Sequence, residues 1–230
     1  TIANAVMWGR SLYKNIQRFI MFQMTINVAA CLIVLVGAFL GTESPLTVTQ
    51  MLWVNLIMDT FAALALASLP PSKSVMDEKP RKVTDPIISK PMAGSIFGIG
   101  GLFFTILLGI LLWFQHTDIS SLANISFDFG SFAELSAKEL SLFFTIFVML
   151  QFWNMFNAKA FMTGKSAFSG LLSCKWFLVI AIVIFFGQIL IVEVGGQMFN
   201  VCHLEIRDWL IIVGATSIVL WIGEIVRAIR

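Results

Sequence analysis

Six long apolar runs constrain the fold of this 230-residue chain more than any other feature of its sequence. A helix needs about 20 apolar residues to cross a bilayer core of roughly 30 Å. Lipid offers no partners to backbone groups and no run alternates as a barrel strand does, so we expect each run to be helical. The sequence therefore predicts an all-α integral membrane protein with a bundle of six transmembrane helices. The runs are approximately residues 19–40, 50–69, 92–114, 140–156, 176–194 and 209–226.

The composition agrees with a membrane protein and excludes several other classes. Hydrophobic residues make up 58% of the chain and charged residues only 12%, with a mean hydropathy of +0.90. A net charge of +2 is too small to indicate a nucleic-acid partner, so the lipid bilayer is the expected surrounding. The three cysteines, Cys31, Cys174 and Cys202, have no metal-binding spacing and would lie in separate places, which predicts neither a zinc site nor a disulfide.

The basic residues indicate how the chain is oriented in the membrane. Thirteen of the 15 Lys and Arg residues lie before the first run, after the sixth, or in the second and fourth connections. Only Lys138 and Arg207 fall in connections on the other side. Because positive residues accumulate on the cytoplasmic side, both termini are predicted to be cytoplasmic.

The segment before the first run differs from the membrane spans. Its apolar residues recur at intervals of three and four, with basic residues on other faces, which is typical of an amphipathic helix. No break separates it from the first span, so we expect one long helix that projects from the membrane as a stalk. The apolar positions are Ala5, Trp8, Leu12, Ile16 and Phe19.

These patterns divide the chain into four parts. Residues 1–18 form the predicted cytoplasmic stalk helix, and residues 19–69 form two spans that carry the candidate cation site. Residues 70–91 are rich in proline and charge and form a predicted cytoplasmic connector. Residues 92–230 form a predicted four-helix support region. The chain starts without methionine, so we expect it to be the C-terminal portion of a longer protein.

Polar side chains within the spans are the candidates for function. Asp59 lies near the middle of the second span, and Asn55 precedes it by four residues, which places both on one face of an α-helix. A buried carboxylate is costly in hydrocarbon and marks an ion pathway by default. Carboxylate and amide oxygens suit a hard cation such as calcium. Further polar candidates in other spans are Gln23, Asn27, Gln151 and Asn154.

The alternative interpretation for the amides is structural. Amide side chains in membrane helices also hydrogen-bond to one another and hold helices together. Under this interpretation, Asn27, Gln151 and Asn154 are as well explained by helix packing as by cation binding.

Two stretches resemble a known family. The sequence MLWVNLIMDT, followed by Pro70 and Pro71, and the preceding WGRSLYKNIQRFIMFQMTINVAA are similar to the sixth and fifth membrane helices of calcium-transporting P-type ATPases. The likeness is greatest to the plasma-membrane type. It is looser over the last four spans, where it rests on FVMLQFWNMFNAK and the number of spans, but it covers the whole chain as the C-terminal six-helix region of the family.

The resemblance implies a calcium site. In that family the asparagine and aspartate of the sixth helix are calcium ligands, which correspond to Asn55 and Asp59, and Asn27 matches an asparagine that lines the cation region. Pumps with two calcium sites carry an acid, a threonine and a glutamate where this chain has Ala30, Met58 and Gln151. The resemblance therefore implies one transported calcium per cycle.

The family resemblance also implies partners that lie outside this chain. The N-terminal spans and the cytoplasmic domains, which bind ATP and magnesium, would belong to the same parent, a translocase of the plasma membrane or the bacterial inner membrane. The 230 residues alone are then predicted to be inactive. The stalk residues Gly9, Arg10 and Tyr13 would pass domain motion to the cation site.

Three other functions remain open at this point. The parent could be a P-type pump for another cation such as manganese or sodium, because oxygen ligands discriminate poorly between hard ions. The six spans could form a complete channel or secondary transporter. They could also form a membrane scaffold in which Asp59 is merely paired inside the bundle.

Overall fold

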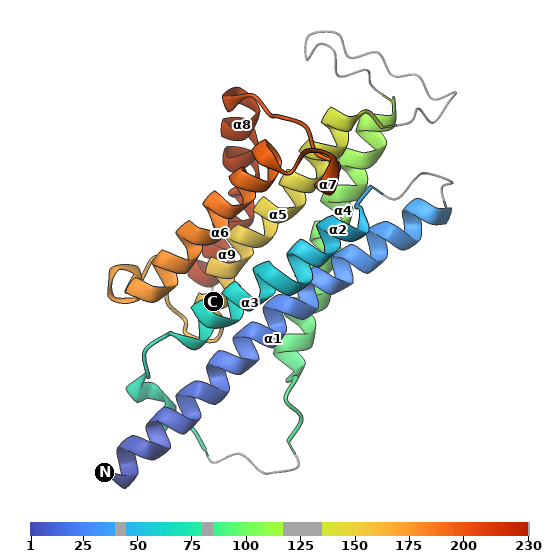
Figure 1. The fold of residues 1–230 in the computed structure, drawn as a ribbon. Helices are drawn as coiled ribbons and strands as arrows, with labels where there is room; N and C mark the ends of the chain where they lie inside the picture. The colour runs from blue at the N-terminus through green and yellow to red at the C-terminus, as the bar shows by residue number, and fades with distance from the viewer. Residues whose placement is uncertain (40–44, 80–84, 117–134, 230) are drawn as a thin grey trace.

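The structure, a computed structural model, describes residues 1–39, 45–79, 85–116 and 135–229, and this part of the chain is helical with no strand (Figure 1). Six of its helical segments are long and apolar enough to cross a membrane, which confirms the predicted all-α bundle. Residues 80–84 of the predicted connector and residue 230 lie outside the described residues.

The helices have the following bounds. The first span belongs to α1 (Ile2–Phe39), and the second is built from α2 (Val48–Leu52), a π-helical segment (Trp53–Met58) and α3 (Asp59–Ala67). The third, fourth and fifth spans are α4 (Lys90–His116), α5 (Ala137–Ala160) and α6 (Lys175–Val194). The sixth consists of α8 (Ile206–Thr216) and α9 (Ile218–Ile229). Shorter elements are α7 (Gly196–Phe199) and two 3₁₀ turns, Lys73–Met76 and Leu171–Ser173.

Helix α1 confirms the predicted extension of the first span. Its 38 residues correspond to about 57 Å of helix, nearly twice the thickness of a bilayer core. Its N-terminal part extends beyond the rest of the bundle (Figure 1). The apolar stripe of this part is largely exposed, with Trp8 59% accessible, whereas Ser11 and Asn15 on another face are buried.

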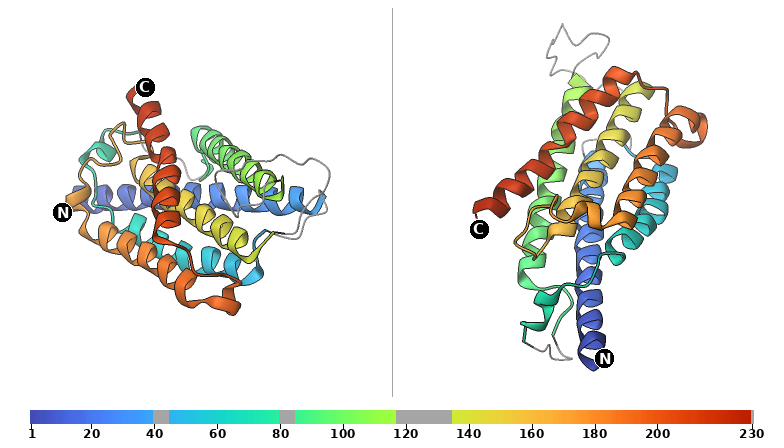
Figure 2. Two further views of the ribbon diagram at one scale, coloured as in Figure 1. Left: turned by 90° about the horizontal axis from the view of Figure 1, so that it is seen from above. Right: turned by 90° about the vertical axis from the view of Figure 1, so that its left-hand side faces the viewer.

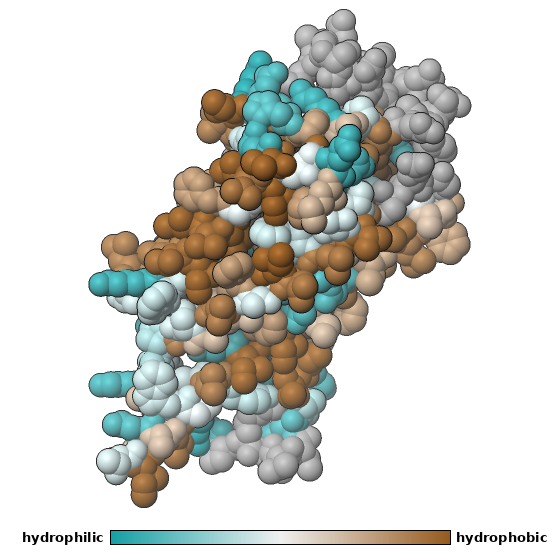
Figure 3. Space-filling model, viewed as in Figure 1, coloured by the Kyte–Doolittle hydropathy of each residue, from teal (hydrophilic) through white to brown (hydrophobic). Residues whose placement is uncertain are grey.

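Helices α1 and α5 form the centre of the bundle. Helix α5 is buried along most of its length. Helices α4 and α9 lie on one side of α1, and α3 and α6 lie on the other (Figure 2). Apolar side chains dominate the middle of the face seen in Figure 3, with hydrophilic side chains toward its two ends, as expected of a bundle that spans a bilayer.

Glycines allow two close helix contacts. A Cβ atom at Gly100 of α4 would lie 3.2 Å from the backbone oxygen of Thr25 in α1. A Cβ atom at Gly223 of α9 would lie 2.2 Å from Oδ1 of Asn157 in α5. Membrane helices pack closely through such small residues, so α4 is held against α1 and α9 is held against α5.

Candidate cation site

The second span changes its helix type where the candidate residues lie. It begins at a capping box in which Thr47 and Gln50 bond to each other's backbone N–H groups. From Trp53 to Met58 the helix is a π-helix, and the backbone N–H of Asp59 donates to the oxygen of Val54, five residues earlier. The regular α-helix predicted here is therefore wrong over this segment. Single π-turns inside helices occur frequently at functional sites.

Asp59 and Asn55, the two principal candidate ligands, have different surroundings at this π-turn. Asp59 is buried, with 3% of its surface exposed, whereas Asn55 is exposed on the described part of the bundle. The prediction that the two residues lie on one face of a regular α-helix is thus corrected. A polar side chain at this depth is costly against lipid.

The carboxyl group of Asp59 has no hydrogen-bond partner among the described residues. The side chain of Gln23 in α1 lies close enough to the carboxyl group to interact with it, but it forms no well-aligned hydrogen bond to either oxygen of Asp59. The described residues offer no basic side chain that pairs with Asp59, so the scaffold interpretation, which requires a paired aspartate, finds no support there. A buried acid without a partner is unfavourable unless a cation, a proton or water balances it.

Two amide side chains of α5 also lack hydrogen-bond partners among the described residues. Gln151 and Asn154 are fully buried, and none of their four side-chain polar atoms has a hydrogen-bond partner in the described residues. The structural interpretation requires such amides to bond between helices, and no such bond is found there. Buried polar groups without partners are uncommon in native proteins and call for an explanation such as a bound ion or water.

Two interhelical hydrogen bonds provide reference points for comparing the heights of these groups along neighbouring helices. Asn15 of α1 donates to the backbone oxygen of Leu69 over 3.1 Å, and Arg18 donates to that of Phe161 over 3.4 Å. Counting about 1.5 Å per residue from these contacts places Asp59 and Asn154 at the same height, roughly 15 Å from Asn15.

By the same count, the three other amides lie within about 5 Å of that height. The half-buried side chains Gln23 and Asn27 are contributed by α1, and the buried Gln151 by α5. By this count, polar residues of three spans fall at a similar level. We call Gln23, Asn27, Asp59, Gln151 and Asn154 the polar layer.

The polar layer contains a single carboxylate, which limits the kinds of cation that it could bind. Within the described ranges no three His, Cys, Asp or Glu side chains come together as a metal-binding group. A cation at this level would depend on one carboxylate, several amides and backbone oxygens. That set suits a hard cation such as calcium rather than a soft transition metal.

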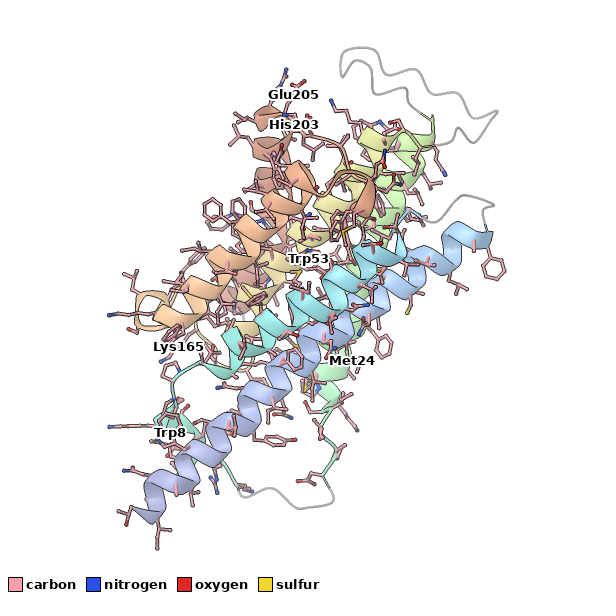
Figure 4. All side chains as sticks on the ribbon, in the orientation of Figure 1. Trp8, Met24, Trp53, Lys165, His203 and Glu205 are labelled. Carbon is pink, nitrogen blue, oxygen red and sulfur yellow. The ribbon has the colours of Figure 1, made fainter. Side chains whose placement is uncertain are left out.

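A contact with α6, not anticipated from the sequence, holds the π-helical segment in place. The indole Nε1 of Trp53 donates a 3.1 Å hydrogen bond to Oε1 of Gln188, which is fully buried. A Cβ atom at the neighbouring Gly187 would lie 3.3 Å from the indole ring. Trp53 lies about midway along the bundle in Figure 4. The signal that could have revealed this contact is Gln188 itself, the one amide in the fifth span.

The predicted coupling residues lie together at the projecting part of α1. Gly9, Arg10 and Tyr13 line a cavity of about 490 Å³ between α1 and the connector. Arg10 donates to the backbone oxygens of Val75 and Glu78, over 3.0 and 2.9 Å. Lys14 forms an ion pair with Glu78. The stalk is therefore fastened to the connector that follows α3.

Comparisons with known proteins agree with this architecture. Residues 43–229 match the family described as "Cation transporting ATPase, C-terminus", and the chain belongs to this family. Among its relatives, the plasma membrane calcium-transporting ATPase 1 of Gallus gallus is 36% identical over 100% of this chain. The corresponding ATPase 2 of Oreochromis mossambicus is 37% identical over 98% of it, and ATPase 3 of Homo sapiens is 37% identical over 100%. The chain spans 18–20% of the length of these relatives.

Proposed function

We propose that this chain is the membrane part of an ATP-driven pump that exports calcium from the cytoplasm by alternating access. The single observation that carries the proposal is the buried carboxyl group of Asp59, which lies beside a π-helical turn and is paired with no basic side chain among the described residues. Broken membrane helices expose backbone oxygens to transported ions, and a change in helix positions alters their affinity. The names of the similar proteins supply calcium as the cation.

Asp59 and Asn55 are the proposed calcium ligands, with Asn27 as a further candidate. Gln23, Gln151 and Asn154 complete the polar region around them. The exposure of Asn55 supports a site that is shared with a membrane helix outside this chain. The isolated chain would then bind calcium weakly and transport none.

One calcium per cycle is the proposed stoichiometry. Ala30 and Met58 are buried and cannot supply a charged or hydroxyl ligand, and Gln151 offers an amide. Asp59 is the only acid of the polar layer. A second calcium would lack the negative charge that calcium sites of this kind normally contain.

The stalk supports a proposal for the partners. ATP and magnesium would bind in cytoplasmic domains of the same parent protein, which also supplies the N-terminal spans. The exposed stripe of Trp8, Leu12 and Ile16 provides an apolar surface for such a domain. Figure 4 shows Trp8 of this stripe on the projecting part of α1. Gly9, Arg10 and Tyr13 would link its motion to the connector. Both termini of the chain would then be cytoplasmic, in a plasma membrane or bacterial inner membrane.

Transport by the full-length protein that contains this chain tests the proposal. We would measure ATP-dependent uptake of radioactive calcium into inverted vesicles for wild type, Asp59→Asn and the control Asp77→Asn. Asp77 is an exposed acid of the connector. Asp59→Asn should abolish uptake while Asp77→Asn retains it. Equal uptake by the Asp59 variant would refute the site, and ATP-independent calcium flux through the isolated chain would favour a channel instead.

A further inference from the structure

A buried amide holds the second span at its outer end, which is the end away from the stalk. Gln50, only 1% exposed, accepts a 3.0 Å hydrogen bond from the backbone N–H of Thr47 and so completes the capping box. The same side chain donates a 2.8 Å hydrogen bond to the backbone oxygen of Phe199, the last residue of α7. Helix α7 lies beside α2 (Figure 1). One side chain therefore closes the start of the second span and joins it to the segment that follows α6.

The segment that receives this bond is itself fixed to the last four spans. The backbone N–H of Cys202 donates a 2.8 Å hydrogen bond to Oγ of Ser141, a fully buried side chain near the start of α5. A Cβ atom at Gly195 would lie 2.9 Å from the ring of Phe199, so α7 folds back tightly on the end of α6. We call residues 195–202 the outer strap. The outer strap links the start of the second span to α5 and α6.

The inner end of the second span is fastened to a different helix. Asn15 of α1 donates to the backbone oxygen of Leu69, just after α3, and the backbone N–H of Ser72 donates to Oγ of Ser11 over 3.2 Å. The side chains of Asn15 and Ser11 are both buried. The end of α3 is therefore tied to α1, whose stalk projects from the bundle.

The π-helical segment lies between these two sets of contacts. Its first residue, Trp53, is bonded to Gln188 of α6, and its last residue precedes Asp59. Helices bend where the regular hydrogen bonds between residues four apart are interrupted, as they are in this segment. Because Asn55 lies inside the segment and Asp59 directly follows it, a bend here changes the position of one proposed ligand relative to the other.

We infer that Gln50 is a positioning residue for cation transport. It holds the outer half of the second span on the outer strap, so that movement of α1 and α3 bends the span at the π-helical segment instead of carrying the whole span along. The bend gives the inward- and outward-facing states different ligand geometries and hence different affinities for the cation. The inference rests on the proposed cation site, but it makes a separate statement about which half of the span moves.

Distances between spin labels in the full-length protein test the bend itself. With the other reactive cysteines replaced, labels at Val48→Cys and Val194→Cys relate the outer half of the span to α6, and labels at Leu64→Cys and Trp176→Cys relate the inner half to α6. All four side chains are exposed on the described part of the bundle. Between the calcium-bound state and the calcium-free state with vanadate, a phosphate analogue, the inner distance should shift by about 2 Å or more and the outer distance should stay constant. Equal shifts of the two distances, or no shift of the inner one, would overturn the inference whether or not Asp59 binds calcium.

Calcium transport tests the role of the side chain. Gln50→Met removes the bond to Phe199, so the outward-facing state should release calcium less completely. Calcium loaded into inverted vesicles should then inhibit uptake at a concentration about 2- to 10-fold lower than in wild type, while the external concentration for half-maximal uptake changes less. The control Thr47→Val removes the hydroxyl group of the capping box but leaves the bond between Gln50 and Phe199.

Two results would contradict the role of Gln50. They are wild-type inhibition by internal calcium in Gln50→Met, and the same change of inhibition in Thr47→Val. Full uptake by Asp59→Asn would instead refute the proposed cation site, and the spin-label distances would still decide which half of the span moves.

Discussion

Trp53 and Gln188 connect the π-helical segment to α6 through a 3.1 Å hydrogen bond between the indole N–H and the amide oxygen. Since the indole ring also lies against Gly187, the contact fixes both the direction and the depth of the Trp53 side chain. The π-helical segment carries Asn55 and ends directly before Asp59. Helix α6 therefore positions the proposed site without supplying a proposed ligand.

We predict that Trp53→Phe weakens the proposed calcium site without removing it. The loss of one buried hydrogen bond, about 0.5–1.5 kcal/mol, corresponds to roughly a 2- to 10-fold higher calcium concentration for half-maximal uptake. The maximal rate should change less. Trp176→Phe is the control, because Trp176 is 71% exposed at the start of α6. An unchanged half-maximal concentration in Trp53→Phe would show that the contact does not set the site geometry.

The stalk contact predicts a different kinetic effect. Arg10→Ala removes the hydrogen bonds to the backbone oxygens of Val75 and Glu78, so the stalk should no longer move together with the connector. We expect ATP-driven uptake to slow by about 10-fold while equilibrium calcium binding is retained. The exposed Lys73 provides the control variant Lys73→Ala. Parallel loss of calcium binding and uptake would indicate that Arg10 supports the site itself.

Adjacent glycines in α4 provide a matched test of helix packing. Gly100→Ala should destabilise the protein, because its Cβ atom would lie 3.1 Å from Val28 Cγ1 and 3.2 Å from a backbone oxygen. Gly101→Ala should be neutral or stabilising, since a Cβ atom there meets nothing within 4 Å. Thermal unfolding in detergent distinguishes the two. Equal unfolding temperatures would contradict the close packing of α4 on α1.

The loop between α5 and α6 has a charged anchor that can be tested in the same way. The buried Lys159 donates to the backbone oxygens of Ala167 and Ser169, over 3.1 and 2.8 Å. Lys159→Met leaves these oxygens without their donor and should lower the free energy of unfolding by about 1–3 kcal/mol. The exposed Lys175 supplies the control Lys175→Met. Similar stability of both variants would show that the anchor contributes little.

The spans were predictable because a sufficiently long apolar run in the sequence identifies a membrane-spanning helix. The continuous α1 also followed from the absence of a break between its amphipathic and apolar parts. The π-turn at Trp53–Met58 was not predictable in this way, because the segment contains neither Gly nor Pro. Its hydrogen bond to α6 joins residues that are 135 positions apart in the sequence.

The candidate site was predicted in part. Asp59 could be identified from the sequence because an acidic side chain inside an apolar run is energetically costly. Its burial follows from the packing of α3 on α1 and α6. The different exposure of Asn55 could not be predicted from a four-residue spacing, because it depends on which neighbouring helices are present. Gln188, a single amide in the fifth span, was not among the predicted site residues. Its burial and its hydrogen bond to Trp53 give it a structural role.

Equilibrium calcium binding to the purified full-length protein tests the central claim most directly. Bound calcium per pump is measured in detergent without ATP, for wild type, Asp59→Asn and Asp77→Asn. We predict about one calcium per pump at saturation for wild type and Asp77→Asn, and loss of this binding in Asp59→Asn. Full binding by Asp59→Asn, with the protein still folded, would contradict the assignment of Asp59 as the acid that holds the transported calcium.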